Sequence, residues 1–124
     1  MQISIIVIGS LFFSIMGIVA LLSPTFVTGL FGEAEIGADM RNEVRAVYGG
    51  FGLAIGALLL LSLWFPGVQN GILLTVGVAL LGMALGRLTS FLIEPAVGKF
   101  PLVFTFVEVL FGSTALFACW ETIS

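Results

Sequence analysis

Long runs of apolar residues alternate with short polar or proline-containing breaks along the whole chain. The apolar runs lie at about residues 3–22, 44–65, 71–93 and 100–120. Each run is about 20 residues long, which is the length an α-helix needs to cross the hydrocarbon core of a bilayer. The pattern therefore predicts an all-α protein, an integral membrane four-helix transmembrane bundle, with residues 1–124 forming a single domain.

The composition excludes an ordinary soluble domain. Sixty per cent of the residues are hydrophobic, only 9% are charged, and the mean hydropathy is +1.26. Soluble domains carry about a quarter charged residues. The chain has no histidine and one cysteine, Cys119, so we expect no metal site, no cofactor and no disulfide within the chain. The sequence has no stripe of basic residues of the kind that binds nucleic acid, so no nucleic-acid partner is expected.

The connections between the runs differ in length. Residues 66–71 contain Pro-Gly and Asn-Gly dipeptides, which predict a tight turn between two helices. The one long connection spans residues 23–43, and its mildly amphipathic stretch 24–31 is expected to lie in the membrane interface. Asp39 or Asn42 is a candidate N-cap for the second helix. The first run lacks the basic start of a signal peptide, so we expect it to remain as a span.

The basic residues predict the orientation. Four crossings place Arg41, Arg45 and Lys99 on one side, with Arg87 near that side within its helix, while the other side has no lysine or arginine. Cytoplasmic loops are enriched in these residues, so this side is predicted to be cytoplasmic. We therefore expect a multi-pass protein of the cytoplasmic (inner) membrane with both termini outside.

Two charged residues lie deep within the predicted spans. Arg87 is roughly 9 Å from the cytoplasmic end of the third helix and Glu108 is roughly 12 Å into the fourth, at 1.5 Å per residue. The second helix brings Glu43, Arg45 and Tyr48 into the same half of the bilayer. We expect a buried cluster in which Glu108 pairs with Arg87 or Arg45, with Glu43 and Tyr48 at its cytoplasmic edge. Such a cluster either fixes the register of the helices or lines a cavity that recognises a polar headgroup.

Glycines at helical spacing predict close contacts between the spans. Small residues three or four positions apart let membrane helices approach each other. Packing within the chain is the favoured interpretation, and a seam between two copies is the alternative. The expected packing glycines are Gly49, Gly52, Gly56, Gly82, Gly86 and Gly112.

Three motifs together resemble a known family. They are the run Asn42-Glu43-Val44-Arg45-Ala46-Val47-Tyr48-Gly49-Gly50, the triplet Gly86-Arg87-Leu88, and Glu108. The chain resembles, over nearly its whole length, a bacterial family of small four-helix membrane proteins catalogued as domain of unknown function 4345. It is more distantly similar to DoxX-type membrane proteins. The resemblance implies the fold and the membrane location, supplies no activity, and singles out Glu43, Arg45, Tyr48, Gly49, Gly50, Arg87 and Glu108.

The residues favour binding over catalysis. We expect a protein that binds a lipid or another lipophilic small molecule, or that acts as an accessory subunit, with membrane lipids and a homodimer or larger membrane complex as its partners. The alternative is a small dimeric transporter that uses a membrane-embedded carboxylate, although a neighbouring arginine favours the charged form of Glu108. Only Glu43, Glu108 and Tyr48 could act as acid or base, so no enzymatic activity is expected.

Overall fold

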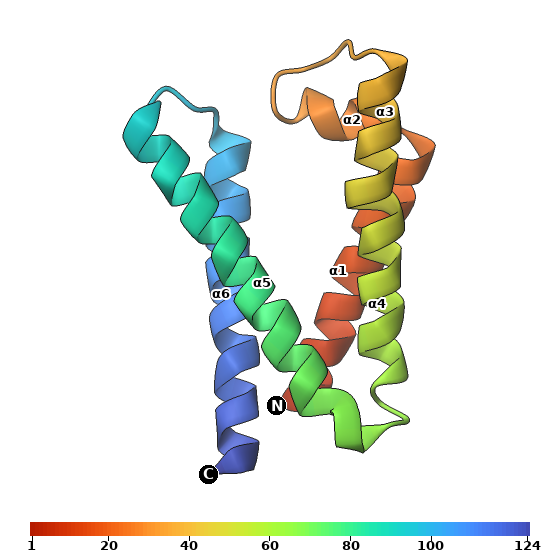
Figure 1. Ribbon diagram of the computed structural model, residues 1–124, viewed down its shortest axis with the longest axis vertical. Helices are drawn as coiled ribbons and strands as arrows, with labels where there is room; N and C mark the ends of the chain where they lie inside the picture. The colour runs from red at the N-terminus through yellow and green to blue at the C-terminus, as the bar shows by residue number, and fades with distance from the viewer. The chain divides into compact units, whose positions relative to one another are not determined.

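The chain is almost entirely helical. A computed structural model describes the backbone of residues 1–124 and every side chain except that of Ile123. The described residues form helices and connections and no strand. The helices are α1 (Gln2–Leu22), α2 (Pro24–Gly29), α3 (Ala38–Val44), the π-helical turn η1 (Arg45–Gly50), α4 (Phe51–Leu61), α5 (Pro66–Ile93) and α6 (Lys99–Ile123) (Figure 1).

Four helical stretches are long and apolar enough to cross a membrane. They are Gln2–Leu22, Ala38–Leu61, Pro66–Ile93 and Lys99–Thr122. The second of them is continuous through α3, η1 and α4. The predicted all-α fold with four membrane-spanning helices is therefore confirmed, whereas the orientation of the termini stays a prediction.

The second spanning helix begins earlier than the sequence pattern predicts. It starts at Ala38 instead of residue 44, and its N-cap is Gly37. The predicted caps Asp39 and Asn42 therefore lie inside the helix, and that prediction was wrong. Asp39 falls in the first turn, where a carboxylate interacts favourably with the positive end of the helix dipole.

The predicted turn at residues 66–71 is also wrong, because these residues begin α5. Proline is favoured in the first helical position, since its missing N–H has no helical partner there. The chain turns instead just before Pro66, where the Gln69 side-chain amide donates to the Ser62 carbonyl oxygen at 2.8 Å. With 28 residues α5 is roughly 42 Å long, longer than the hydrocarbon core, which a tilted helix accommodates.

The chain divides into two compact units. Unit 1 comprises Met1–Ile6 and Ser62–Ser124, and unit 2 comprises Val7–Leu61. The first turn of α1 therefore belongs to unit 1 with α5 and α6, and the rest of α1 belongs to unit 2 with α2 to α4. Each unit is described separately.

In unit 2, α1 and α4 lie side by side with their backbones in close contact (Figure 1). A Cβ atom added at Gly56 would lie 3.1 Å from the Ser10 carbonyl oxygen, and one at Gly52 would lie 3.3 Å from that of Phe13. One at Gly17 would lie 2.9 Å from the Gly49 carbonyl oxygen. Glycine at these positions is what lets the two helices approach so closely.

The Ser10 hydroxyl adds a polar contact to this interface, and its removal gives a first test. It is buried and donates to the Gly56 carbonyl oxygen at 2.8 Å. Ser10→Ala is expected to lower the free energy of unfolding by about 0.6 kcal/mol, the average for hydrogen bonds between membrane helices. Unfolding in mixed micelles, with the exposed Ser113→Ala as the control, would measure it; an unchanged midpoint would contradict the assignment.

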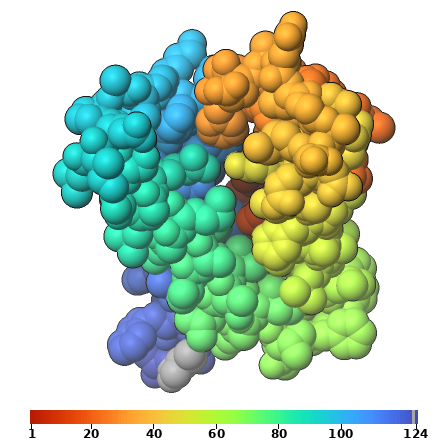
Figure 2. Space-filling model, turned by 45° about the horizontal axis from the view of Figure 1, so that its top comes forward, coloured from red at the N-terminus to blue at the C-terminus, as the bar shows by residue number. Residues whose placement is uncertain are grey.

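One end of unit 2 is closed by a small hydrophobic cluster. Its buried members are Ala20, Val27 and Val44, and the partly buried side chains of Val19, Phe31, Ile36 and Tyr48 pack against them. Figure 2 shows α2 and the connection that follows it, in orange, gathered over the end of the unit. The long connection is therefore a packed cap.

In unit 1, α5 and α6 are antiparallel neighbours that pack along most of their length (Figure 1). Each buries one face. The buried residues are Leu73, Val76, Gly77, Leu80 and Ala84 on α5, and Thr105, Glu108, Gly112, Ala115, Ala118 and Cys119 on α6. The α6 face is small and polar, so the larger side chains of α5 fit against it.

The glycines of α5 do not all contact a neighbouring helix. A Cβ at Gly77 would lie 3.1 Å from the Gly112 carbonyl oxygen, and one at Gly112 would lie 3.0 Å from that of Gly77. A Cβ at Gly82 or Gly86 would meet nothing within 4 Å. Here the structure differs from the prediction: α5 turns its Leu, Val and Gly77 face toward α6, and about 100° per residue puts Gly82 on the opposite side from Leu80.

Candidate functional site

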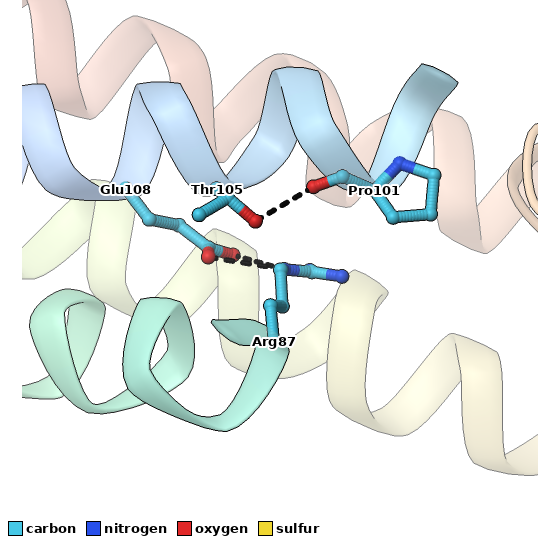
Figure 3. A network of polar contacts seen from close by, with 4 residues as sticks. All are labelled: Arg87, Pro101, Thr105 and Glu108. Atoms are coloured by element: carbon cyan, nitrogen blue, oxygen red, sulfur yellow. Dashed lines mark hydrogen bonds and ion pairs between the residues drawn. The ribbon is translucent and has the colours of Figure 1, made fainter. Parts of the chain in front are cut away.

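An ion pair inside unit 1 joins two charged residues that lie well inside membrane-spanning segments, Arg87 of α5 and Glu108 of α6. Arg87 Nε lies 3.0 Å from Oε1 and 3.0 Å from Oε2 of Glu108 (Figure 3). The Glu108 side chain is 6% exposed, whereas that of Arg87 is 21% exposed. Of the two arginines that the sequence offers as partners for Glu108, the structure therefore assigns Arg87.

The antiparallel arrangement of α5 and α6 brings these two side chains together. Arg87 on α5 and Glu108 on α6 both point into the space between the two helices, where the ends of their side chains meet (Figure 3). The tight contact of Gly77 with Gly112 fixes the register in which this happens.

A second α6 residue contacts the guanidinium. The Arg87 Cζ atom lies over the Phe104 ring, 5.6 Å from its centroid, within the range of a cation–π interaction. Phe104 precedes Glu108 by one helical turn, so both contacts come from one face of α6. The neighbouring Thr105 donates its hydroxyl to the Pro101 carbonyl oxygen of its own helix at 2.8 Å (Figure 3). The polar groups of this face are thus satisfied within unit 1.

The pair uses the Nε–H edge of the guanidinium, and Figure 3 shows the rest of the Arg87 group extending past the carboxylate, along α6 toward Pro101. Both Glu108 oxygens thus lie against the same edge of the guanidinium. Among the described residues, no group of three His, Cys, Asp or Glu side chains could hold a metal ion.

The other predicted site residues belong to unit 2. The Nε–H of Arg45 donates to the Leu21 carbonyl oxygen at 3.1 Å and so satisfies one of the last carbonyls of α1. Glu43 is exposed, and Tyr48 is half-buried against the hydrophobic cap cluster. In unit 2, the structure therefore gives Arg45 and Tyr48 contacts that stabilise the end of α1 and the cap.

Arg45 and Tyr48 lie in the π-helical turn η1, which the sequence analysis missed. A Cβ at Gly49, in the same turn, would lie 2.8 Å from Leu21 Cγ. Arg45 and Gly49 thus both contact Leu21, one by a hydrogen bond and the other by close approach. Single π-helical turns within α-helices are frequent at functional sites. No individual residue in this stretch of the sequence predicts the turn.

A second polar cluster in unit 1 was also missed. The Gln2 side-chain amide lies 2.7 Å from Asn70 Oδ1, 3.0 Å from the Ala118 carbonyl oxygen and 2.7 Å from Thr122 Oγ1. The Cys119 thiol donates to the Asn70 carbonyl oxygen at 3.4 Å. These contacts tie the start of α1 to the start of α5 and the end of α6. Because polar residues are common near helix ends, no pattern in the sequence indicates that these residues lie together.

Comparison with protein-family models matches nearly the whole chain. A family model described as "Domain of unknown function (DUF4345)" matches residues 1–119. No curated protein and no solved structure matches the chain. The match covers α1 to α5 in full and α6 as far as Cys119.

Proposed function

The chain belongs to the family described as domain of unknown function (DUF4345), and we propose that it binds a lipid or another lipophilic small molecule at the Arg87–Glu108 pair. The observation that carries the proposal is the ion pair itself, with Arg87 Nε 3.0 Å from both Glu108 oxygens between two membrane-spanning helices. Ionisable residues at such depth are costly and commonly mark a binding site or pathway.

Packing of α5 against α6 does not depend on this pair. The two helices already bury a Leu and Val face against a small-residue face and meet at Gly77 and Gly112. A buried ion pair is often no more stabilising than well-packed apolar residues of the same size. Stability alone is therefore a weak reason for placing an arginine and a glutamate here, which favours a role in binding.

The surroundings of Arg87 favour an amphiphilic ligand. Part of its side chain is accessible, and the neighbouring outward-facing side chains are apolar. These exposed neighbours are Leu85, Leu88, Leu102 and Val103. A molecule that reaches the guanidinium at this depth has to place an apolar part against such side chains and a hydrogen-bond acceptor against the polar group. Lipids and lipophilic small molecules with one polar group meet both conditions.

Transport by a proton-coupled carboxylate is the weaker alternative. An exchanging carboxylate has to gain and lose a proton and then bind the substrate. Both oxygens of Glu108 lie 3.0 Å from Arg87 Nε, so a substrate that binds this carboxylate has to displace the contact with Arg87. Proton-driven uptake into proteoliposomes that depends on Glu108 would favour the transporter instead.

Native mass spectrometry of the protein released from mild detergent tests the proposal. Wild type is expected to carry a small molecule at fixed stoichiometry, and Glu108→Gln and the double substitution Arg87→Met with Glu108→Met are expected to lose it. Glu121→Gln makes the same change at an exposed position of α6 and is expected to keep it. Wild type without a bound molecule, or equal retention in all variants, would contradict the proposal, and a co-purifying protein lost in the same variants would instead indicate an accessory subunit.

A further inference from the structure

We propose that Arg45 forms a second binding site, which takes the phosphate group of a membrane phospholipid at the end of α1. This site belongs to unit 2, whereas the Arg87–Glu108 pair belongs to unit 1, and it is independent of the function proposed above. Three features of the molecule support it: the contact that holds the Arg45 guanidinium, the depth of that contact in the membrane, and the charges of unit 2.

The Arg45 guanidinium is held through one nitrogen only. Its Nε–H donates to the Leu21 carbonyl oxygen at 3.1 Å, and the described residues give the Arg45 side chain no other hydrogen bond and no ion pair. A guanidinium has five N–H donors, so the four on its terminal nitrogens remain for a ligand. Arginine is always charged, and its planar fork of donors matches two oxygens of a phosphate group. Because Arg45 is exposed, a phosphate can reach these donors.

Close packing fixes the backbone around this contact. A Cβ added at Gly49 would lie 2.8 Å from Leu21 Cγ, and one added at Gly17 would lie 2.9 Å from the Gly49 carbonyl oxygen. Arg45 begins the π-helical turn η1, which contains Gly49, and turns of this kind are frequent at functional sites. A binding group that is positioned in advance loses less freedom when its ligand binds.

The length of α1 places the contact at the level of the lipid headgroups. This spanning helix contains no charged residue. From Gln2 to Leu21 it rises roughly 29 Å at 1.5 Å per residue, which is close to the thickness of the hydrocarbon core. A cation beside the Leu21 carbonyl therefore lies where the phosphates of the lipids begin. The last turns of α1 also expose the apolar side chains of Ile18, Leu21 and Leu22, against which an acyl chain can lie.

The charges of unit 2 favour a lipid over a free phosphate ion. The unit has two arginines and four exposed carboxylates, which are those of Glu33, Glu35, Asp39 and Glu43. Its net charge is therefore negative and repels small anions that approach from the water. A lipid instead reaches Arg45 by diffusing within the membrane with its acyl chains against α1. A zwitterionic headgroup avoids the repulsion, so phosphatidylethanolamine is the probe that suits the site.

Arginine side-chain NMR in dodecyl maltoside, a detergent without phosphate, tests the wild type directly. The chain has three arginines, so ¹⁵N-arginine labelling gives three Nε–H signals, which single substitutions to lysine assign. Phosphatidylethanolamine is expected to shift the Arg45 signal until it saturates. The Arg41 signal is expected to stay unchanged, because that side chain already donates to the Ile36 carbonyl oxygen at 2.6 Å. Diacylglycerol with the same acyl chains and inorganic phosphate at the same concentration are expected to leave the Arg45 signal in place.

Two results of this titration would overturn the proposal. One is an Arg45 signal that does not respond to phosphatidylethanolamine. The other is an equal shift with inorganic phosphate, which would indicate a site for free anions instead of a lipid. Because Arg45 and Arg87 give separate signals, a failure at Arg45 is distinguishable from a failure of the function proposed for Arg87.

Substitution of Arg45 measures how much the contact contributes. Native mass spectrometry gives the phosphatidylethanolamine concentration at which half of the protein carries one lipid. This concentration is expected to rise about tenfold in Arg45→Gln, which loses the charge-assisted hydrogen bonds, and to stay within about twofold in Arg41→Gln, which loses the same charge from the same helix end. All proteins compared also carry Arg87→Met and Glu108→Met, so that a lipid bound at that pair does not enter the count. Equal weakening in both variants would indicate a general attraction of charge and would overturn the site.

Discussion

Arg87→Met is expected to lower the free energy of unfolding by about 3–5 kcal/mol, the range found when one partner of a buried ion pair is removed. The Glu108 side chain is only 6% exposed, so the substitution leaves a carboxylate between two spanning helices without its cation. That carboxylate has either to remain charged in a medium of low dielectric constant or to bind a proton, and both cost free energy.

The double substitution Arg87→Met with Glu108→Met separates this cost from the packing of the helices. It removes both charges and keeps similar side-chain volume, so most of the lost stability is expected to return. The free energies of unfolding of the wild type, Arg87→Met and the double variant would be measured in mixed micelles of the same detergent composition. If the double variant is as unstable as Arg87→Met, the pair contributes to stability by itself, and the argument that it is retained for binding fails.

Alanine at the glycines of α5 is expected to act in opposite directions at different positions. A Cβ at Gly77 would lie 3.1 Å from the Gly112 carbonyl oxygen and 3.3 Å from Ala115 Cβ, so the helices have to separate slightly. Overpacking of this kind typically costs about 1–3 kcal/mol. A Cβ at Gly82 or Gly86 meets no atom within 4 Å, and alanine in place of glycine within a helix gains about 0.5–1 kcal/mol.

The two open glycines therefore serve as controls on the same helix. Thermal unfolding of the detergent-solubilised variants would rank them, with Gly77→Ala below the wild type and Gly82→Ala and Gly86→Ala at or above it. If Gly82→Ala or Gly86→Ala instead destabilises the protein in a way that depends on protein concentration, this face is a seam between copies.

The apolar runs alone predict the four spans, because the membrane imposes one length and one secondary structure on each of them. The helix ends are less predictable. Pro66 stands at a position where proline indicates a turn as readily as the first residue of a helix, and the structure uses it as the latter. Residues 38–43, four of which are polar or charged, form the first part of the second spanning helix before its apolar run, so hydropathy places the start of that helix too late.

The site was predictable in its members on α5 and α6 and less so in its contacts. The spacing along α6 predicts that Thr105, Glu108 and Gly112 share one small and polar face. In the structure this face is buried. Which arginine pairs with Glu108 depends on the register between helices, which the spacing within one helix does not encode. Phe104 was missed because it is one of twelve phenylalanines, and only the three-dimensional contact distinguishes it.

The Gln2 cluster has a consequence for the order of events during synthesis. Its hydrogen bonds join Gln2 to Asn70, Ala118 and Thr122, which follow it in the chain by 68, 116 and 120 residues. The ribosome makes Gln2 long before Ala118 and Thr122. Until these residues are made, the Gln2 side-chain amide lacks its hydrogen bonds to them. Unit 1 can close only after α6 has entered the bilayer, and an insertion machinery that shields the start of α1 until then would suit this chain better than helix-by-helix release into lipid.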